Sequence, residues 1–371
     1  MTTSPMTECI VIGGGVMGLM TAIELRWSGL TVEIYERQHI GKEASWAGGG
    51  ILGSLHPLNE SAANLQLIAW GQRHYPELAE RLHVSTGIDP EYYPCGMWWL
   101  TEEPDTAIAM QRWARDQALS LDIMQASEIS EPGKLNISDN TLILSLPQIA
   151  SIRNPRLLRA LHHYALQIGI TIHENSPARL IAQSPSTLQV QIADQIRTAN
   201  HIILTGGAWS SQILPGEVLD IRPVKGQMLI FSPESPLLEH IVVAGDHYLI
   251  PRKDGRIISG STVEECGYDK TPSDTAASML AEKACQLLPE LETVPVEKHW
   301  AGLRPGTCRS TPYICRHPNY SNLYLNTGHY RNGFSMAPGA AHLIASLITG
   351  TSPALSPEPY TYLPEETRML A

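Results

Sequence analysis

Residues 8–37 read ECIVIGGGVMGLMTAIELRWSGLTVEIYER and combine short apolar runs with glycine-rich breaks. The run Cys9–Ile12 predicts a buried strand, because a short apolar run that ends at turn residues is typical of a strand covered on both faces. After three glycines (13–15), apolar residues at helical spacing predict a helix that ends at Gly29. Thr31–Tyr35 then predicts a second strand. A strand, a helix and a second strand in so few residues indicate a Rossmann-like α/β unit.

The glycines of this unit have the GxGxxG spacing of a dinucleotide-binding turn. Gly13 permits the tight turn, Gly15 lets a pyrophosphate approach the backbone, and Gly18 lets the helix pack closely on the strand. The helix N-terminus favours the anionic pyrophosphate. Glu36, at the end of the second strand, accepts hydrogen bonds from ribose hydroxyls and repels a 2′-phosphate. A plain glycine-rich turn is the alternative, but the combined pattern predicts a dinucleotide, either FAD or NAD.

A second glycine-rich stretch, EASWAGGGIL at residues 43–52, favours the flavin. A nicotinamide enzyme normally enters its next helix–strand unit through a short loop. Here small residues, among them Ala44, Ser45, Gly49 and Gly50, let the backbone approach a flat ring. A flexible surface loop is the alternative. The position directly after the ribose-binding strand favours a ligand contact.

Composition limits the classes of partner and compartment. The chain has 371 residues, of which 43% are hydrophobic and 17% charged, as in ordinary globular proteins. Its net charge of −11 argues against nucleic acid and anionic membrane as partners. Six scattered cysteines form no CxxC pair and no zinc spacing, so we expect free thiols, no metal and a cytoplasmic location. No run of 18 apolar residues and no basic leader occurs, so we expect neither a transmembrane helix nor a signal peptide.

The middle of the chain reads differently from its start. NPRLLRALHHYALQIG, residues 154–169, predicts a helix with Asn154 as its N-cap and Gly169 as its stop. HIIL at 201–204 predicts a buried strand that runs into two glycines. Consecutive strand patterns without helices between them indicate an antiparallel sheet and a second domain interleaved with the first. The predicted elements are strands at 170–173, 178–182, 188–192, 226–231, 247–251, 256–262 and 296–303, and a helix at 274–288.

Arg304, within HWAGLRPGT at residues 299–307, has no acidic residue closer in sequence than Glu297. Burying its guanidinium without an anion would cost several kcal/mol, roughly, so we expect a bound anion there. An arginine fork holds a carboxylate at two points and fixes its angle, which lysine does not. A surface arginine that caps backbone carbonyls is the alternative.

Five stretches together resemble the glycine oxidase branch of the D-amino-acid oxidase family, which includes the glycine oxidases of thiazole biosynthesis. They follow the family's order over nearly the whole chain. The resemblance implies an FAD-binding domain at 1–85, 148–220 and 302–371, and a substrate domain with an antiparallel sheet at 86–147 and 221–301. The five stretches are IVIGGGVMG (10–18), EASWAGGGIL (43–52), YLIPRKDGRIISGST (248–262), WAGLRPGT (300–307) and GHYRNGFSMAPGAA (328–341).

The same resemblance implies the roles of individual residues. Arg304 holds the substrate carboxylate, Tyr248 donates a hydrogen bond to it, and Arg331 is the family's second arginine beside the active site, although an ion pair or a loop anchor fits Arg331 nearly as well. The segment His329–Ser335 lies along the flavin. The cofactor contacts implied by the fingerprint and by the resemblance are Gly13, Gly15, Val16, Met17, Gly18, Glu36, Arg37, Ala44, Ser45, Gly49, Gly50, Ile51, Ala178, His329, Tyr330, Arg331, Asn332, Gly333, Phe334 and Ser335.

The implied reaction is the oxidative deamination of glycine by FAD and O₂, with glyoxylate, ammonia and H₂O₂ as products and the imine as a supply for the thiazole of thiamine. Sarcosine and D-alanine remain possible substrates, because a pocket distinguishes one methyl group by only about 1–3 kcal/mol. A D-amino-acid or sarcosine dehydrogenase or oxidase with another electron acceptor is the second hypothesis. The family further implies non-covalent FAD, despite Cys308 beside GLRPGT, and a homotetramer.

Overall fold

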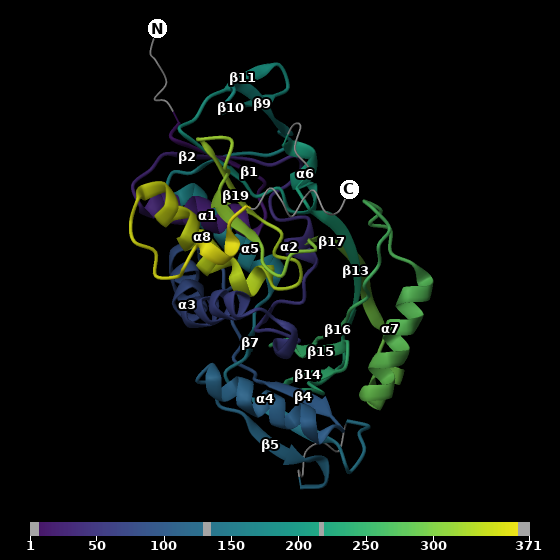
Figure 1. The fold of residues 1–371 in the computed structure, drawn as a ribbon. Helices are drawn as coiled ribbons and strands as arrows, with labels where there is room; N and C mark the ends of the chain where they lie inside the picture. The colour runs from purple at the N-terminus through teal and green to yellow at the C-terminus, as the bar shows by residue number, and fades with distance from the viewer. Residues whose placement is uncertain (1–6, 129–134, 215–218, 363–371) are drawn as a thin grey trace.

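The computed structural model describes residues 7–128, 135–214 and 219–362 of the chain. Two large sheets, one of six strands and one of eight, form its framework, with two small sheets beside them. In Figure 1 the elements around β1 (Cys9–Ile12) and α8 (Gly333–Thr349) form one half of the molecule, and those around β4 (Met97–Thr101) form the other. The long strands β13 (Arg222–Phe231) and β17 (Val296–Gly306) lie at the junction.

The six-stranded sheet has the order β18-β19-β12-β1-β2-β8. The strand β1 lies between β12 and β2 and is parallel to both, and only β18 pairs antiparallel within this sheet. The predicted strands at 9–12 and 201–204 have the predicted bounds, which confirms the Rossmann-like half of the predicted fold. The remaining bounds are β2 (Val32–Tyr35), β8 (Thr171–His173), β12 (His201–Leu204), β18 (Tyr313–Arg316) and β19 (Leu323–Thr327).

Four helices pack together on this half, and α8 lies against both α1 (Val16–Trp27) and α3 (Ala62–Thr86). The predicted helix at 154–168 is α5 (Asn154–Gln167), but Asn154 is its first residue and Arg153 is its N-cap. The Asn154 amide donates instead to the backbone oxygens of Ser45 and Gly48, at 3.0 and 2.9 Å. This long-range contact removes the side chain from the capping position that its local sequence favours.

The eight-stranded sheet has the order β17-β13-β16-β15-β14-β4-β6-β5 and is antiparallel except between β14 and β4. Its long helix α7 (Asp274–Leu287) ends one residue before the predicted end. This sheet confirms the predicted antiparallel part of the fold. The remaining bounds are α4 (Pro104–Asp116), β5 (Asp122–Gln125), β6 (Leu142–Leu146), β14 (Ile241–Ala244), β15 (His247–Pro251) and β16 (Ile257–Gly260).

The strand β17 continues to Gly306 and does not end at Leu303, as its sequence predicted. Pro305 lacks an N–H and cannot donate to a ladder. Its partner in β13 is Pro223, so neither residue of this pair has a donor to leave unpaired. The pairing therefore extends past Arg304 and across the predicted domain boundary at 301/302. The boundaries themselves stay a prediction.

The smaller elements complete the description. The segment 43–52 is not a plain loop, because it contains a helical turn and a short strand. In that segment they are α2 (Ala44–Ala47) and β3 (Ile51–Leu52). The other small elements of the chain are β7 (Ala150–Ser151), β9 (Ala178–Ser184), β10 (Thr187–Ile192), β11 (Gln195–Arg197) and α6 (Ser210–Ile213).

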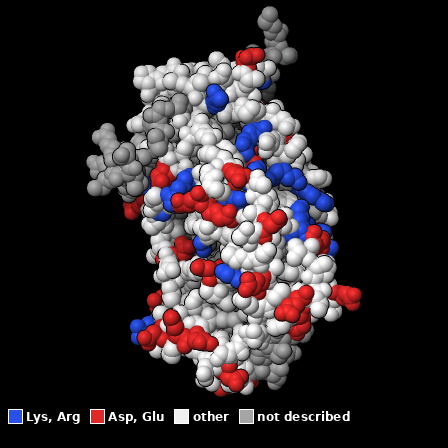
Figure 2. Space-filling view, turned by 90° about the vertical axis from the view of Figure 1, so that its right-hand side faces the viewer, with Lys and Arg blue, Asp and Glu red and all other residues white. Residues whose placement is uncertain are grey.

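Charged side chains are interspersed across the middle of the surface in Figure 2, and acidic ones predominate toward its lower end. Among the described residues, no helix has both the length and the apolar character needed to cross a bilayer. The described residues also contain no group of three or more His, Cys, Asp or Glu side chains suited to a metal ion.

Gly18 permits the closest approach of α1 to the strand before it. A Cβ at this position would lie 1.9 Å from the Gly13 backbone oxygen. We therefore expect Gly18→Ala to lower the free energy of unfolding by about 1–3 kcal/mol and to weaken FAD binding, because helix and strand must separate. Urea unfolding and FAD titration measure the two effects. Gly333→Ala is the control for stability alone, since its Cβ would meet only ordinary contacts at 3.6 Å or more, and equal stability of the two variants would contradict the prediction.

Candidate active site

A cleft of about 1550 Å³, counting the solvent in its open part, lies where the six-stranded sheet meets β17. The carboxyl ends of β1, β2, β12 and β19 border it, as is usual for ligand sites in parallel sheets. The predicted site residues that line it are Gly13, Gly15, Val16, Met17, Glu36, Arg37, Ala44, Ser45, Ala178, Arg304, His329, Tyr330, Arg331, Gly333 and Phe334.

The start of α1 can receive an anionic group. Its N-cap residue, Gly15, offers no side-chain cap, and its first turn contains no acidic residue. The Val16 N–H donates to Ser45 Oγ at 3.0 Å, and a Cβ on Gly15 would lie 3.0 Å from the same atom. Gly13 has a φ of 110°, and its Cβ would lie 2.5 Å from the Thr205 oxygen. Backbone N–H groups and absent Cβ atoms therefore fit the pyrophosphate of a dinucleotide.

Glu36 occupies the position that the sequence predicted for a ribose-binding carboxylate. It is 7% exposed and lines the cleft at the end of β2. Its Oε2 accepts the Gly14 N–H at 2.8 Å and its Oε1 accepts the Gln38 N–H at 3.0 Å. Because a carboxylate has about four acceptor positions, the two bonds leave capacity for ribose hydroxyls.

Arg37 stacks on a tryptophan that the sequence analysis did not identify. Its guanidinium carbon lies 3.6 Å from the centre of the Trp209 ring, and its Nη2 pairs with Glu43. Lys270 also pairs with Glu43 at 2.9 Å, and the Tyr268 hydroxyl donates to the Ala208 oxygen at 3.0 Å. Residues that follow β16 thus reach across to the cofactor side of the cleft. In the sequence, the only sign that the segment around Trp209 borders the cleft was the glycine pair after the strand at 201–204, and such a pair is also typical of an ordinary turn.

Arg304 is partly buried and makes hydrogen bonds only to uncharged oxygens. Its Nη1 donates to the Thr262 and Lys225 backbone oxygens at 3.1 and 3.3 Å, and its Nη2 donates to Ser261 Oγ at 2.7 Å. A Cβ at Gly226 would lie 2.2 Å from Nη1, so this glycine makes room for the guanidinium. Burial lowers the pKa of Arg304. Within the described ranges no carboxylate pairs with it, and its charge can therefore meet an anionic ligand.

Tyr248 and Arg331 lie close to Arg304. The Tyr248 hydroxyl raises the pKa of Arg304 and the charge of Arg331 lowers it, which are smaller effects than burial. Tyr248 is buried in β15, and a Cβ on Gly260 would lie 2.9 Å from its hydroxyl. The structure thus brings the three predicted substrate-binding residues together, although Tyr248 does not border the cleft itself.

The segment that precedes α8 is tied to β17. The Tyr330 N–H donates to the Pro305 oxygen at 3.2 Å, and Tyr330 has a φ of 44°, which a non-glycine residue adopts only under tertiary constraint. His329 is 4% exposed, and its Nε2 has no hydrogen-bond partner among the described residues. Burial lowers the pKa of His329 to about 3, so its imidazole is neutral at physiological pH.

Several predicted cofactor contacts do not border the cleft. Gly50 has a φ of 75° and its Cβ would lie 2.1 Å from the Ile152 oxygen, so it serves a close backbone contact. Ser335 Oγ accepts the Gly53 N–H at 3.1 Å and donates to the Ile51 oxygen at 3.0 Å. Direct contact of these residues with FAD stays a prediction. The residues outside the cleft lining are Gly18, Gly49, Gly50, Ile51, Asn332 and Ser335.

The neutral state of His329 has a consequence for stability. The unfolded imidazole binds a proton near pH 6.5, whereas the folded one does so only near pH 3. Lowering the pH below 6.5 therefore favours the unfolded state, by at most about 1.4 kcal/mol per pH unit. His329→Gln removes this titration, so its unfolding free energy should fall less steeply than that of the wild type between pH 6.5 and about 4. Urea unfolding at several pH values measures both slopes, and equal slopes would contradict the prediction.

Comparison with known proteins identifies the family. The family model DAO, FAD dependent oxidoreductase, matches residues 8–347. The chain is 40% identical to the glycine oxidase of Pseudomonas putida over 362 residues, 95% of this chain and 97% of that protein. It is 31% identical to the bifunctional protein ThiO/ThiG of Trichormus variabilis, over 92% of this chain and 52% of that protein. The crystal structure of glycine oxidase from Geobacillus kaustophilus superposes with a TM-score of 0.89 at 25% identity, over 96% of this chain and 98% of that one. The predicted family is confirmed, and this chain belongs to the DAO family of FAD-dependent oxidoreductases.

Proposed function

We propose that this protein is a glycine oxidase, which converts glycine, O₂ and water into glyoxylate, ammonia and H₂O₂. The observation that carries the proposal is the Arg304 guanidinium, which lies at the cleft with Tyr248 beside it and with no carboxylate of a described residue paired to it. A substrate carboxylate supplies the missing negative charge. The glycine oxidases among the relatives, which align over almost the whole chain, support glycine as the amino acid.

The protein's own residues position the substrate. Arg304 holds the carboxylate at two points, because its fork geometry matches a carboxylate. Tyr248, which lies beside Arg304 behind the cleft lining, is assigned a further hydrogen bond to the carboxylate, and Arg331, which lines the cleft, adds positive charge. FAD, when bound, supplies the acceptor for the hydride of the substrate α-carbon and returns the electrons to O₂. The protein thus contributes mainly by orienting the substrate, and correct orientation removes a large part of the activation barrier in such reactions.

No imidazole of the site is suited to act as a base at neutral pH. Burial lowers the pKa of His329 to about 3, and burial also lowers the pKa of His299 on β17. We infer that the substrate amine arrives neutral and that the rate rises with pH as the free amine is deprotonated. A rate profile that shifts in His329→Gln would contradict this inference.

Three further features belong to the proposal. Thiamine biosynthesis is the proposed pathway of the reaction. It is supported by the relative ThiO/ThiG, a bifunctional protein in which only one part is similar to this chain. A cytoplasmic location agrees with six free cysteines. A homo-oligomer, with the tetramer implied by the family, stays a prediction. A D-amino-acid or sarcosine dehydrogenase with another acceptor is the alternative, and measuring H₂O₂ distinguishes the two.

The direct test is anaerobic reduction of the purified holoenzyme by glycine. We expect the flavin band at about 450 nm to bleach on addition of glycine and to return with O₂, with one H₂O₂ formed for each glyoxylate. Bleaching by sarcosine or D-alanine but not by glycine would overturn glycine as the substrate. Bleaching without H₂O₂ on reoxidation would favour the alternative acceptor.

Arg304→Lys tests the carboxylate contact. Lysine keeps the charge but loses the fork, so we expect the KM for glycine to rise at least about tenfold, while FAD stays bound. Steady-state kinetics and the flavin absorbance measure these two effects. Arg222→Lys, in the neighbouring strand β13 and largely exposed, is the control and should leave the KM unchanged. An unchanged KM in Arg304→Lys would remove the assigned role.

The cofactor should dissociate from the denatured protein. Cys308, the cysteine beside GLRPGT that could attach a flavin covalently, is exposed, and its Sγ lies 2.9 Å from Arg222 Nη1. It does not line the cleft. After precipitation with acid we expect the yellow colour in the supernatant. Colour that stays in the pellet of the wild type and is lost from it in Cys308→Ser would show a covalent flavin.

A further inference from the structure

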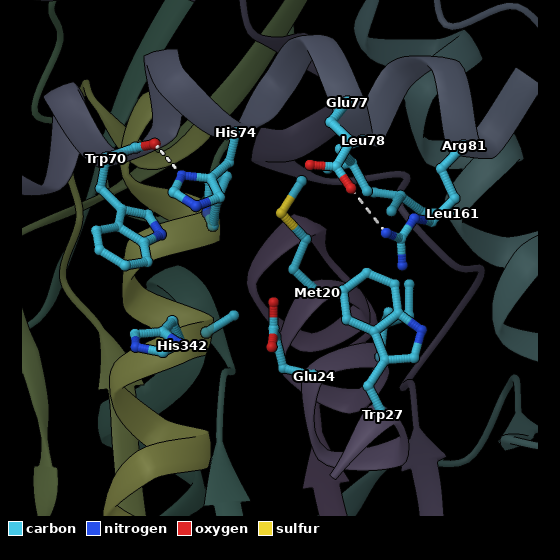
Figure 3. Close-up of a pocket in the computed structure, with 13 residues that line it drawn as sticks. Met20, Glu24, Trp27, Trp70, His74, Glu77, Leu78, Arg81, Leu161 and His342 are labelled. Atoms are coloured by element: carbon cyan, nitrogen blue, oxygen red, sulfur yellow. Dashed lines mark hydrogen bonds and ion pairs between the residues drawn. The ribbon is translucent and has the colours of Figure 1, made fainter. Parts of the chain in front are cut away.

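A second cavity lies between the helices α1, α3, α5 and α8, away from the cleft (Figure 3). It encloses about 860 Å³, counting the part open to solvent. No residue that lines it also lines the candidate active site. It is therefore a separate site, which the oxidation of glycine does not use. Its lining residues are Met20, Ile23, Glu24, Trp27, Trp70, His74, Glu77, Leu78, Arg81, Leu161, Pro338, Ala341 and His342.

The walls of this cavity are mainly apolar and aromatic. Trp70 is stacked between His74 and His342, with ring centres 4.4 and 4.8 Å away. Trp27 borders the opposite side and is 41% exposed. Met20, Leu78 and Leu161 complete the apolar surface. A ligand with an apolar body fits these walls better than a fully polar one.

One carboxylate in the cavity has no partner. Glu24 extends from α1 into the middle of the cavity, as Figure 3 shows, and makes no hydrogen bond or ion pair with any described residue. The second carboxylate, Glu77, is already paired with Arg81 at 2.8 Å. Burial raises the pKa of Glu24, and the charge of Arg81 offsets this in part. Glu24 thus has no hydrogen-bonded or ion-paired partner among the described residues, although the charge of Arg81 acts on it at longer range.

We propose that this cavity binds a small organic cation, an ammonium group carried on an apolar body. The ammonium pairs with Glu24, and the body contacts Met20, Leu78 and Leu161. An anionic ligand would meet the charge of Glu24, and a neutral one would leave that charge uncompensated in a partly buried place. The amino-acid substrate fits less well, because it carries a carboxylate and the arginine of the lining, Arg81, is already paired with Glu77.

The cavity and the cleft are distinguishable by the charge that each needs. The cleft offers Arg304 to a carboxylate, whereas the cavity offers Glu24 to a cation. The two sites share α1, since Val16 borders the cleft and Glu24 borders the cavity, eight residues or about 12 Å along the helix. A cation without a carboxylate therefore probes the cavity alone.

Isothermal titration of the FAD-loaded enzyme with cyclohexylammonium tests the proposal. We expect one binding site per chain, and Glu24→Gln should weaken binding at least about tenfold, because the charged partner is lost. Glu80→Gln is the matched control, since it removes the same charge from an exposed position of α3 outside the cavity and should leave the affinity unchanged. Cyclohexanol, a neutral molecule of similar shape, should bind at least about tenfold more weakly than the cation.

Thermal unfolding gives a second readout that does not depend on catalysis. Glutamine replaces a carboxylate that has no protein partner, so Glu24→Gln should fold and have a Tm equal to or above that of the wild type. Cyclohexylammonium should raise the Tm of the wild type but not that of Glu24→Gln. The proposal is wrong if the wild type does not bind the cation, if Glu24→Gln binds it equally, or if cyclohexanol binds as tightly. If the wild type does not bind cyclohexylammonium but forms an oligomer that dissociates in Glu24→Gln, the cavity would instead be assigned to a second copy of the chain.

Discussion

The Arg304 guanidinium is a positive charge that the described protein surrounds with carbonyl and hydroxyl oxygens rather than with a carboxylate. This arrangement holds the side chain in place but leaves its charge without a counter-ion, which is costly in a partly buried position. Gly226 provides the space for the guanidinium, and the pairing of β13 with β17 fixes where that space lies. The geometry of the cleft around Arg304 therefore depends on one pair of antiparallel strands.

The same strand pair joins the part of the cleft around Arg304 to the segment that precedes α8. Pro305 follows Arg304 in β17, and its oxygen accepts the Tyr330 N–H just before α8. Two proline residues opposite each other let the ladder pass this point without an unpaired donor, and the carbonyl of one remains free for the loop. At the other end of the cleft, Gly13 and Gly18 bring α1 against β1 at a distance that no side chain would allow. Both ends thus depend on positions where a larger or a hydrogen-bonding residue would interfere.

Local patterns predicted the elements well where the relevant interactions are also local. The strands at 9–12, 201–204 and 247–251 have the predicted bounds, because apolar runs between turn residues determine them. The capping role of Asn154 was wrong, since its amide bonds to a segment more than a hundred residues away. The stack of Arg37 on Trp209 and the room made by Gly226 could not be predicted either. Each depends on a pairing between distant segments, which a single sequence does not reveal.

Arg304 and Glu24 present the same physical situation with opposite sign. Each is a charged side chain at a concave surface, each is partly buried, and neither makes an ion pair with a residue that the structure describes. Motifs flanking Arg304 predict a role for it, whereas Glu24 sits in a helix whose pattern is otherwise that of an ordinary apolar core. A structural carboxylate at that place would be expected to have a basic neighbour within hydrogen-bonding distance, and Arg81 is instead engaged by Glu77. Uncompensated charge lowers stability, so its presence at both cavities is better explained by ligands of opposite charge than by folding.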